Sequence, residues 1–318
     1  MGIKKVKLIS LLIVFFVMSG IFLTSRSMGA ETNINKNVIF RVEKGESAQD
    51  ITTRLERDGF ISSTFIFNLY LRLLGADKNI QSGDYLFEGG ISSWTIAHRF
   101  AKGDYNLSLI KITIPEGSTV EDIAGIISKN IEAVDRESFI AEAQSYEGYL
   151  FPDTYFFSPV ERTTDIIQKM RSNFDARTET MKPAFASSKK KIDDIITMAS
   201  IIEKETDNET DRRIVSGILW KRIYIDMPLQ VDASFAYYLH KTSRELTQND
   251  LKTDSPYNTY IHRGLPKGPI SNPGLASIKA TLFPTKSNYL YYLNGRDGKT
   301  RYAETLEEHK KNRAKYLD

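Results

Sequence analysis

The stretch from Ile192 to Thr206 (IDDIITMASIIEKET) constrains the fold of this chain most, because it reads as a helix with an apolar stripe. Apolar residues recur at steps of three and four as far as Ile202, which is the period of an amphipathic helix. Glu203 follows Ala199 by four positions, so a carboxyl group lies on or beside the stripe. A carboxyl group beside apolar side chains loses hydration, which favours its neutral form and suits a general acid at neutral pH.

Two interpretations of Glu203 follow from this position. It is either a candidate catalytic acid or a side chain at the edge of the stripe that reaches solvent, as long charged side chains do beside a core. Lys204 and Glu205 are expected to point away from the stripe and to be wet. Glu205 is two positions after Glu203, which is about 200° around a helix.

Composition narrows the class of protein. The chain has 318 residues, 41% of them hydrophobic and 26% charged, which is typical of a globular protein with about two domains. The net charge is +3 and four positive charges precede the first acid, so no nucleic-acid partner is indicated. The absence of Cys excludes disulfides and thiolate chemistry. The four histidines form no H-E-x-x-H pair, and we predict no metal and no other cofactor.

The N-terminus carries a membrane signal. Residues Leu8 to Ser25 contain no charge, and three of the seven residues before them are lysine. Such a run is just long enough to span a bilayer, and the positive-inside rule places Met1 in the cytoplasm. We therefore predict that residues 1–30 are a cytoplasmic tip and a single-pass anchor in the cytoplasmic membrane, with the rest outside. The alternative is a cleaved signal peptide, since small residues follow Arg26.

An internal repeat organises the next part of the chain. Val42–Ile51 (VEKGESAQDI) resembles Ile114–Ile123 (IPEGSTVEDI), and the glycines and Asp-Ile pairs keep one offset of 72 residues. Gly90–Ile96 is a weaker third copy. Each copy has a β-like run, a glycine turn, a Ser or Thr suited to N-capping, and a helical pattern. Helices are predicted over residues 48–58, 63–74, 93–101, 120–130, 136–144, 163–173, 210–223 and 305–317, with a strand within 78–87 and a hairpin of 289–293 with 300–303.

The first copy resembles a known module. Val38 to Leu74 is similar to the start of a LysM domain, in which a strand, a turn and a helix open a βααβ unit. The resemblance implies a small α+β domain over residues 38–117 that binds glycan containing N-acetylglucosamine. Strand–glycine–helix units are common, so coincidence is the alternative.

Loops rich in Pro, Gly, Asn and Tyr mark the second half. Glu147–Tyr155 (EGYLFPDTY) places aromatic residues around a Pro-Asp turn, which suits either a saccharide groove or a turn packed on the core. Met227–Ser234 and Asp254–Gly274 are further loops of this composition. Loops held by a rigid scaffold often carry ligand contacts.

Several motifs together resemble one family. ASIIEKET at Ala199–Thr206, EGYLFPDTY at Glu147–Tyr155, LQVD at Leu229–Asp232, and SPYNTY at Ser255–Tyr260 with the GLP that begins at Gly264 look like those of the endolytic murein transglycosylases, also called YceG-like. The order of the motifs and the predicted anchor agree. The resemblance covers nearly the whole chain.

This resemblance implies a function and a site. The family cuts the MurNAc-GlcNAc bond inside peptidoglycan glycan strands and leaves 1,6-anhydro-MurNAc ends, which would terminate strand elongation. Its catalytic glutamate lies in the motif that contains Glu203, so we predict Glu203 as the catalytic residue of an α+β catalytic domain over residues 118–318. The family also suggests work beside cell-wall synthases at the membrane. The expected substrate-binding residues are Tyr149, Gln230, Asp232, Tyr257 and Asn258.

Two other classes of function stay open. One is a noncatalytic, membrane-tethered peptidoglycan-binding protein. The other is a glycan hydrolase that pairs Glu203 with Glu147, Asp153 or Asp232, because hydrolases use two carboxyl groups. A lytic transglycosylase can use one, since the C6 hydroxyl of its substrate attacks C1. The products distinguish the three classes: anhydro ends identify a lytic transglycosylase, reducing ends a hydrolase, and uncut glycan a binding protein.

Overall fold

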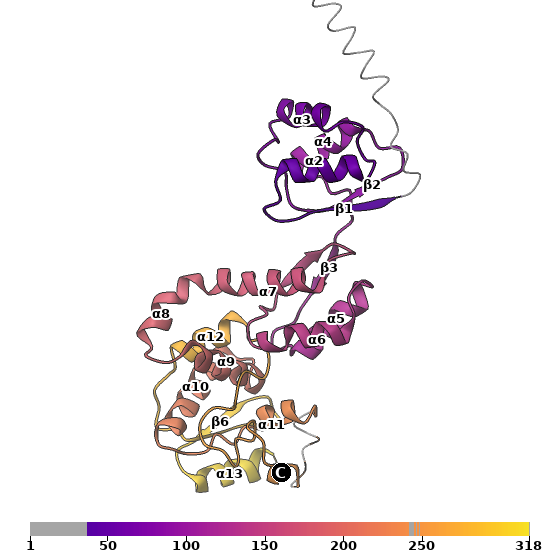
Figure 1. The fold of residues 1–318 in the computed structure, drawn as a ribbon. Helices are drawn as coiled ribbons and strands as arrows, with labels where there is room; N and C mark the ends of the chain where they lie inside the picture. The colour runs from indigo at the N-terminus through magenta and orange to yellow at the C-terminus, as the bar shows by residue number, and fades with distance from the viewer. Residues whose placement is uncertain (1–36, 242–244, 246, 248, 318) are drawn as a thin grey trace, which may run out of the picture. The chain divides into compact units, whose positions relative to one another are not determined.

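The chain folds as a mixture of helices and small antiparallel sheets, which confirms the predicted α+β class. The computed structural model describes residues 37–241, 245, 247 and 249–317. The predicted anchor within residues 1–30 lies outside these residues. No helix in the described part of the chain is long and apolar enough to cross a membrane. The chain divides into two compact units between Ser108 and Leu109 (Figure 1).

The first unit is built on one strand pair. Its elements are β1 (Val38–Val42), α2 (Ala48–Arg57), α3 (Thr64–Leu73), β2 (Gly83–Phe87) and α4 (Ser93–Lys102). β1 and β2 are antiparallel, with Val38 opposite Phe87 and Val42 opposite Gly83. Aromatic side chains form much of the core, where Phe40 stacks on Phe87 with ring centroids 5.7 Å apart. The strands and helices follow the order β1-α2-α3-β2-α4, and both the LysM-like assignment and glycan binding by this unit stay predictions.

The repeated turn-and-cap unit is present in all three copies. Gly45 and Gly117 have positive φ angles of 82° and 76°, a conformation that glycine adopts without strain. The side chains of Ser47 and Thr119 accept hydrogen bonds from the amides three residues on, at 3.1 Å in both cases. Ser92 caps α4 in the same way at 3.2 Å. These caps satisfy backbone donors that the first turn of each helix leaves free.

The second unit contains two further strand pairs and the remaining helices. Its strands are β3 (Ile110–Thr113), β4 (Thr154–Phe157), β5 (Tyr291–Asn294) and β6 (Thr300–Ala303). Its helices are α5 (Val120–Asn130), α6 (Arg136–Ala143), α7 (Thr163–Thr178), α8 (Lys182–Ser187), α9 (Ile192–Glu205), α10 (Glu209–Tyr224), α11 (Asp232–Tyr238), α12 (Leu275–Leu282) and α13 (Leu306–Tyr316). Short 3₁₀ turns lie at Gln144–Tyr146, Glu179–Met181 and Asp250–Lys252.

The boundary between the units differs from the predicted one after Gly117. β3 pairs antiparallel with β4, with Ile110 opposite Phe157, so the segment from residue 109 belongs to the second unit. This pairing joins segments more than forty residues apart, and no local pattern in the sequence indicates it. α8, α11 and α12 were also absent from the predicted helices.

Helix α9 lies at the centre of the second unit, packed against α10, α11 and α12 (Figure 1). Every residue from Ile195 to Glu203 is buried, whereas Ile192 is 51% exposed. Most of the helix therefore has no solvent side. Its acidic first turn and the basic residue in its last turn complement the helix dipole.

A short turn at Thr206–Asn208 joins α9 to α10. Thr206 leaves the helical conformation at φ −161° and ψ 143°. Asn208 then caps α10, its side chain accepting hydrogen bonds from the amides of Thr210 and Asp211. This turn brings the start of α10 back beside the end of α9, where the glutamates of the motif lie.

Candidate active site

Glu203 is buried, as the apolar stripe predicted, but its carboxylate is held by the protein on both oxygens. Its side chain is 4% exposed. Oε1 accepts a hydrogen bond from Arg212 Nη2 at 2.9 Å, and Oε2 accepts one from the Gly274 amide at 2.8 Å. Arg212 also donates to the Thr206 carbonyl at 3.0 Å. These contacts join the end of α9 to the starts of α10 and α12.

Glu116 lies close to this ion pair. Burial and the negative charge of Glu203 raise the pKa of Glu116, while Arg212 opposes the rise. A β-carbon on Gly274 would lie 1.8 Å from the Glu116 carboxylate, which shows how tightly these segments approach. The surroundings of Glu203 are thus a packed junction between segments.

Glu205 is only partly exposed, whereas the sequence predicted a wet side chain. Its side chain is half-buried and accepts a hydrogen bond from the Tyr292 hydroxyl, while its backbone carbonyl accepts one from Asn294 Nδ2 at 2.8 Å. Burial raises the pKa of Glu205 to about 7, and the nearby charge of Asp232 adds to the rise. The Tyr292 hydrogen bond and Arg222 act in the opposite direction. The physical reason is that β5, from far along the sequence, packs over this side of α9.

Glu205 lines an open cavity of about 510 Å³. Gln230 and Asp232, two of the predicted binding residues, line it as well. Tyr260 donates a hydrogen bond to Asp232 Oδ1 at 2.5 Å. Gln230 has a positive φ angle of 52°, and its backbone N–H donates a hydrogen bond to the Thr259 carbonyl at 3.1 Å. The remaining lining includes Arg222, Tyr291, Tyr292, Asn294, His309 and Arg313.

Tyr149, Tyr257 and Asn258 do not line this cavity. Asn258 is fully buried, and its amide nitrogen donates to the carbonyls of Leu251 and Thr253 at 3.0 and 2.8 Å. Tyr149 donates to Asp193, and its ring packs on α7. Tyr257 stacks against α11. Their contacts are those of residues that fix the loops in place.

The other predicted carboxyl groups are also engaged by the protein. Glu147 is 7% exposed, and burial raises its pKa to about 7. Its Oε2 accepts hydrogen bonds from the Val120 amide and the Tyr237 hydroxyl at 3.0 and 3.1 Å, and its Oε1 accepts one from Asn272 at 2.9 Å. Asp153 forms an ion pair with Arg177 at 2.5 Å. Of the three carboxyl groups considered as partners in a hydrolase, Asp232 is the one that faces the cavity.

The sequence missed the contribution of Tyr260, Tyr292 and Arg222 to this site. The tyrosine-rich composition of the loops and of the 289–293 segment was the only signal that pointed to them. Within the described residues there is no group of three or more His, Cys, Asp and Glu side chains that could hold a metal ion. The side chains that line the cavity offer carboxyl, phenol, amide, guanidinium, ammonium and imidazole groups.

The cavity combines a carboxyl group whose pKa is raised to about 7 with polar side chains, an arrangement that is typical of acid–base sites. The model of the YceG-like family matches residues 40–315, and the chain belongs to this family. It is 31% identical to an endolytic murein transglycosylase of Bacillus subtilis strain 168, over 95% of this chain and 91% of that protein.

Two further relatives agree with this placement. An endolytic murein transglycosylase of Streptococcus pneumoniae D39 is 27% identical, and the match covers 91% of this chain and 60% of that longer protein. The crystal structure of a putative YceG-like protein from Listeria monocytogenes is 32% identical, with a TM-score of 0.59, and the match covers 87% of this chain and 99% of that one.

Proposed function

We infer that this protein is an endolytic murein transglycosylase, which cleaves the MurNAc-GlcNAc bond within peptidoglycan glycan strands. The family membership and the relatives' activity support the reaction class. The observation that carries the assignment to a site is the half-buried Glu205, whose pKa is raised to about 7 beside Asp232 in an open cavity. A general acid works best when its pKa lies near the operating pH.

We propose Glu205 as the group that transfers the proton, in place of the Glu203 expected from the sequence motif. Glu203 has one oxygen on Arg212 and the other on the Gly274 amide. A substrate oxygen could reach it only by displacing one of these contacts. Glu205 lines the cavity, and among the described residues the Tyr292 hydroxyl is the hydrogen-bond partner found for its carboxyl group. Glu203 then acts by fixing the helix that carries Glu205.

The reaction needs one carboxyl group acting twice. Protonated Glu205 gives its proton to the glycosidic oxygen as the bond from C1 of MurNAc to that oxygen breaks. The resulting carboxylate takes the proton of the MurNAc C6 hydroxyl, whose oxygen attacks C1 and closes the 1,6-anhydro ring. No water is consumed. The Asp232 carboxylate, held by Tyr260, lies in the cavity where it can stabilise positive charge that develops at C1.

A glycan hydrolase is the second candidate, because Asp232 provides a second carboxyl group in the same cavity. The products decide between the two reactions. The full chain is incubated with purified glycan strands, and the new ends are identified by chromatography and mass spectrometry. Anhydro-MurNAc ends support the transglycosylase. Reducing ends alone would identify a hydrolase, and uncut strands would leave only a binding role.

We also propose that residues Leu8 to Ser25 keep the protein in the cytoplasmic membrane with both units outside, beside the cell-wall synthases. The support is the charge-free run and the lysines that precede it. Mass analysis of the protein isolated from membranes tests this. A mature chain that begins near Ala30 would show a cleaved signal peptide instead.

The first unit has a proposed role in holding glycan. Its βααβ order agrees with the LysM-like pattern. Binding of the full chain to insoluble peptidoglycan is compared with that of a chain lacking residues 38–108. Equal binding by the two chains would show that this unit does not contribute to glycan binding.

A further inference from the structure

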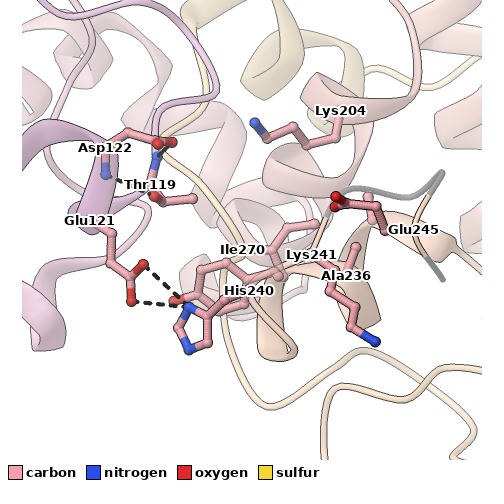
Figure 2. A pocket seen from close by; sticks show the side chains of 11 residues that line it. Thr119, Glu121, Asp122, Lys204, Ala236, His240, Lys241, Glu245 and Ile270 are labelled. Carbon is pink, nitrogen blue, oxygen red and sulfur yellow. Dashed lines mark hydrogen bonds and ion pairs between the residues drawn. The ribbon is translucent and has the colours of Figure 1, made fainter. Parts of the chain in front are cut away.

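A second cavity lies beside the one that contains Glu205. It has a volume of about 500 Å³ and lies entirely within the second unit (Figure 2). Lys204 and Ala233 line both cavities. A strand bound across Glu205 therefore has this second cavity within reach of its substituents.

The two cavities differ in chemistry. The second has an apolar wall of Ala233, Ala236 and Ile270, and charged groups of both signs around it. Lys204 is exposed, and no hydrogen bond or ion pair to its side chain is found in the described part of the chain. Glu121, in the first turn of α5, faces His240 at 3.1 Å across the cavity edge. In Figure 2 the Lys204 amine and the Glu121–His240 pair lie at different ends of the cavity.

This lining fits a peptide better than a sugar. While the lactyl carboxyl group of each MurNAc is in its amide bond to the peptide, the sugars of a glycan strand carry no ionised groups, so charged side chains gain little from the sugars themselves. A peptidoglycan stem peptide carries free carboxylates, commonly one free amine, and alanine methyl groups. An ammonium and a carboxylate spaced around small apolar residues complement that pattern of charge.

We propose that this cavity binds the peptide stem carried by a MurNAc residue next to the bond that is cut. Lys204 pairs with a stem carboxylate, Glu121 pairs with the amine of the stem, and the alanine methyl groups lie on Ala233 and Ala236. The proposal rests on the transglycosylase function proposed above. It makes the enzyme selective for strands that still carry peptides.

The end of α9 is arranged to serve this role. Glu203 is fixed by Arg212 and Gly274, and Glu205 lines the first cavity. Lys204 lies between them and points to the surface shared by both cavities. The peptide contact is thus held in register with the proton-transferring group by one rigid helical turn.

The test compares two substrates. Uncross-linked strands with intact stems and the same strands stripped of peptides by an amidase are cleaved by the wild-type chain, Lys204→Ala, Glu121→Gln and Lys129→Ala. Lys129 lies at the far end of α5 and is the control. We expect wild-type kcat/KM to be roughly tenfold higher on strands with stems, since hydrogen bonds to charged groups are lost with the peptide. Lys204→Ala and Glu121→Gln remove that preference, Glu121→Gln leaves the cleavage of stripped strands unchanged, and Lys129→Ala changes neither rate.

Two outcomes overturn the proposal. Equal wild-type rates on the two substrates, or equal losses on both in Lys204→Ala, would make the cavity a sugar subsite or a plain surface. If the wild type cuts neither substrate, the transglycosylase proposal fails, and the peptide site is tested separately. Binding of an isolated stem tetrapeptide is then measured by calorimetry. Binding that Lys204→Ala weakens keeps the proposal, and no binding ends it.

Discussion

Replacing each glutamate of the motif by glutamine separates the catalytic carboxyl group from the structural one. Glu205→Gln keeps the size of the side chain but cannot give or take a proton. Acid–base assistance is typically worth about 10² to 10⁴ in rate, and here one group serves both steps. We therefore expect Glu205→Gln to lower kcat by about 10⁴ while glycan binding stays near that of the wild type.

The stability of the same variant should rise. The pKa of Glu205 is about 7 in the folded protein against 4.5 for the unperturbed group. The stabilisation from its neutral form is complete below pH 4.5 and is lost as the pH rises through 7. Each pKa unit corresponds to about 1.4 kcal/mol, so ionisation costs the fold up to about 3 kcal/mol. Glu205→Gln avoids this cost, and its Tm at pH 8 should exceed that of the wild type.

Glu203→Gln should behave in the opposite way. It leaves the buried Arg212 without its charge partner, and breaking a buried pair typically costs about 3 to 5 kcal/mol. In a unit of this size about 3 kcal/mol lowers Tm by roughly 6–12 °C. Below its Tm the variant should retain much of the wild-type cleavage, because the Gly274 contact can persist.

The assay incubates both variants with intact sacculi and counts the anhydro ends, with melting curves taken on the same samples. A folded Glu203→Gln protein that makes no anhydro ends, together with an active Glu205→Gln, would refute the assignment. Glu203 would then be the proton-transferring group.

Two further predictions concern the pH profile and the packing. Wild-type kcat/KM should fall above about pH 7, because Glu205 loses its proton there. Asp232→Asn removes a charge that raises the pKa of Glu205, so the fall should move to lower pH. Tyr292→Phe removes a hydrogen bond that lowers the pKa of Glu205, so the fall should move to higher pH. Shifts in the same direction in both variants would contradict the account of Glu205. Gly148→Ala should destabilise the second unit by about 2 to 4 kcal/mol. The reason is that Gly148 has φ 87° and that a β-carbon there would lie 2.6 Å from Pro269. An unchanged midpoint of urea unfolding would show that the loop can move aside.

Local patterns determined much of the secondary structure. The helix over 120–130 has the predicted bounds, and most of the other predicted helices differ from the observed ones by no more than one residue at either end. Caps and apolar periodicity act within a few residues, so they are legible in the sequence. The α7 helix extends to Thr178, five residues beyond its predicted end. Phe174 and Arg177 in the added residues contact Tyr149 and Asp153, and no local signal encodes these tertiary contacts.

Apolar periodicity indicated that a carboxyl group of the EKE motif lies near the core, and loop composition predicted that residues around Gln230 and Asp232 bind a ligand. Tertiary contacts set the surroundings of the two glutamates, and those surroundings are the basis for proposing Glu205 as the proton-transferring group. Periodicity places Glu203 and Glu205 on opposite sides of α9, but it cannot say what covers each side. α10 and α12 bring Arg212 and Gly274 to Glu203, and β5 brings Tyr292 to Glu205. Because α9 is packed on several sides, it has no single solvent-exposed face, and burial alone does not distinguish Glu203 from Glu205 as the general acid.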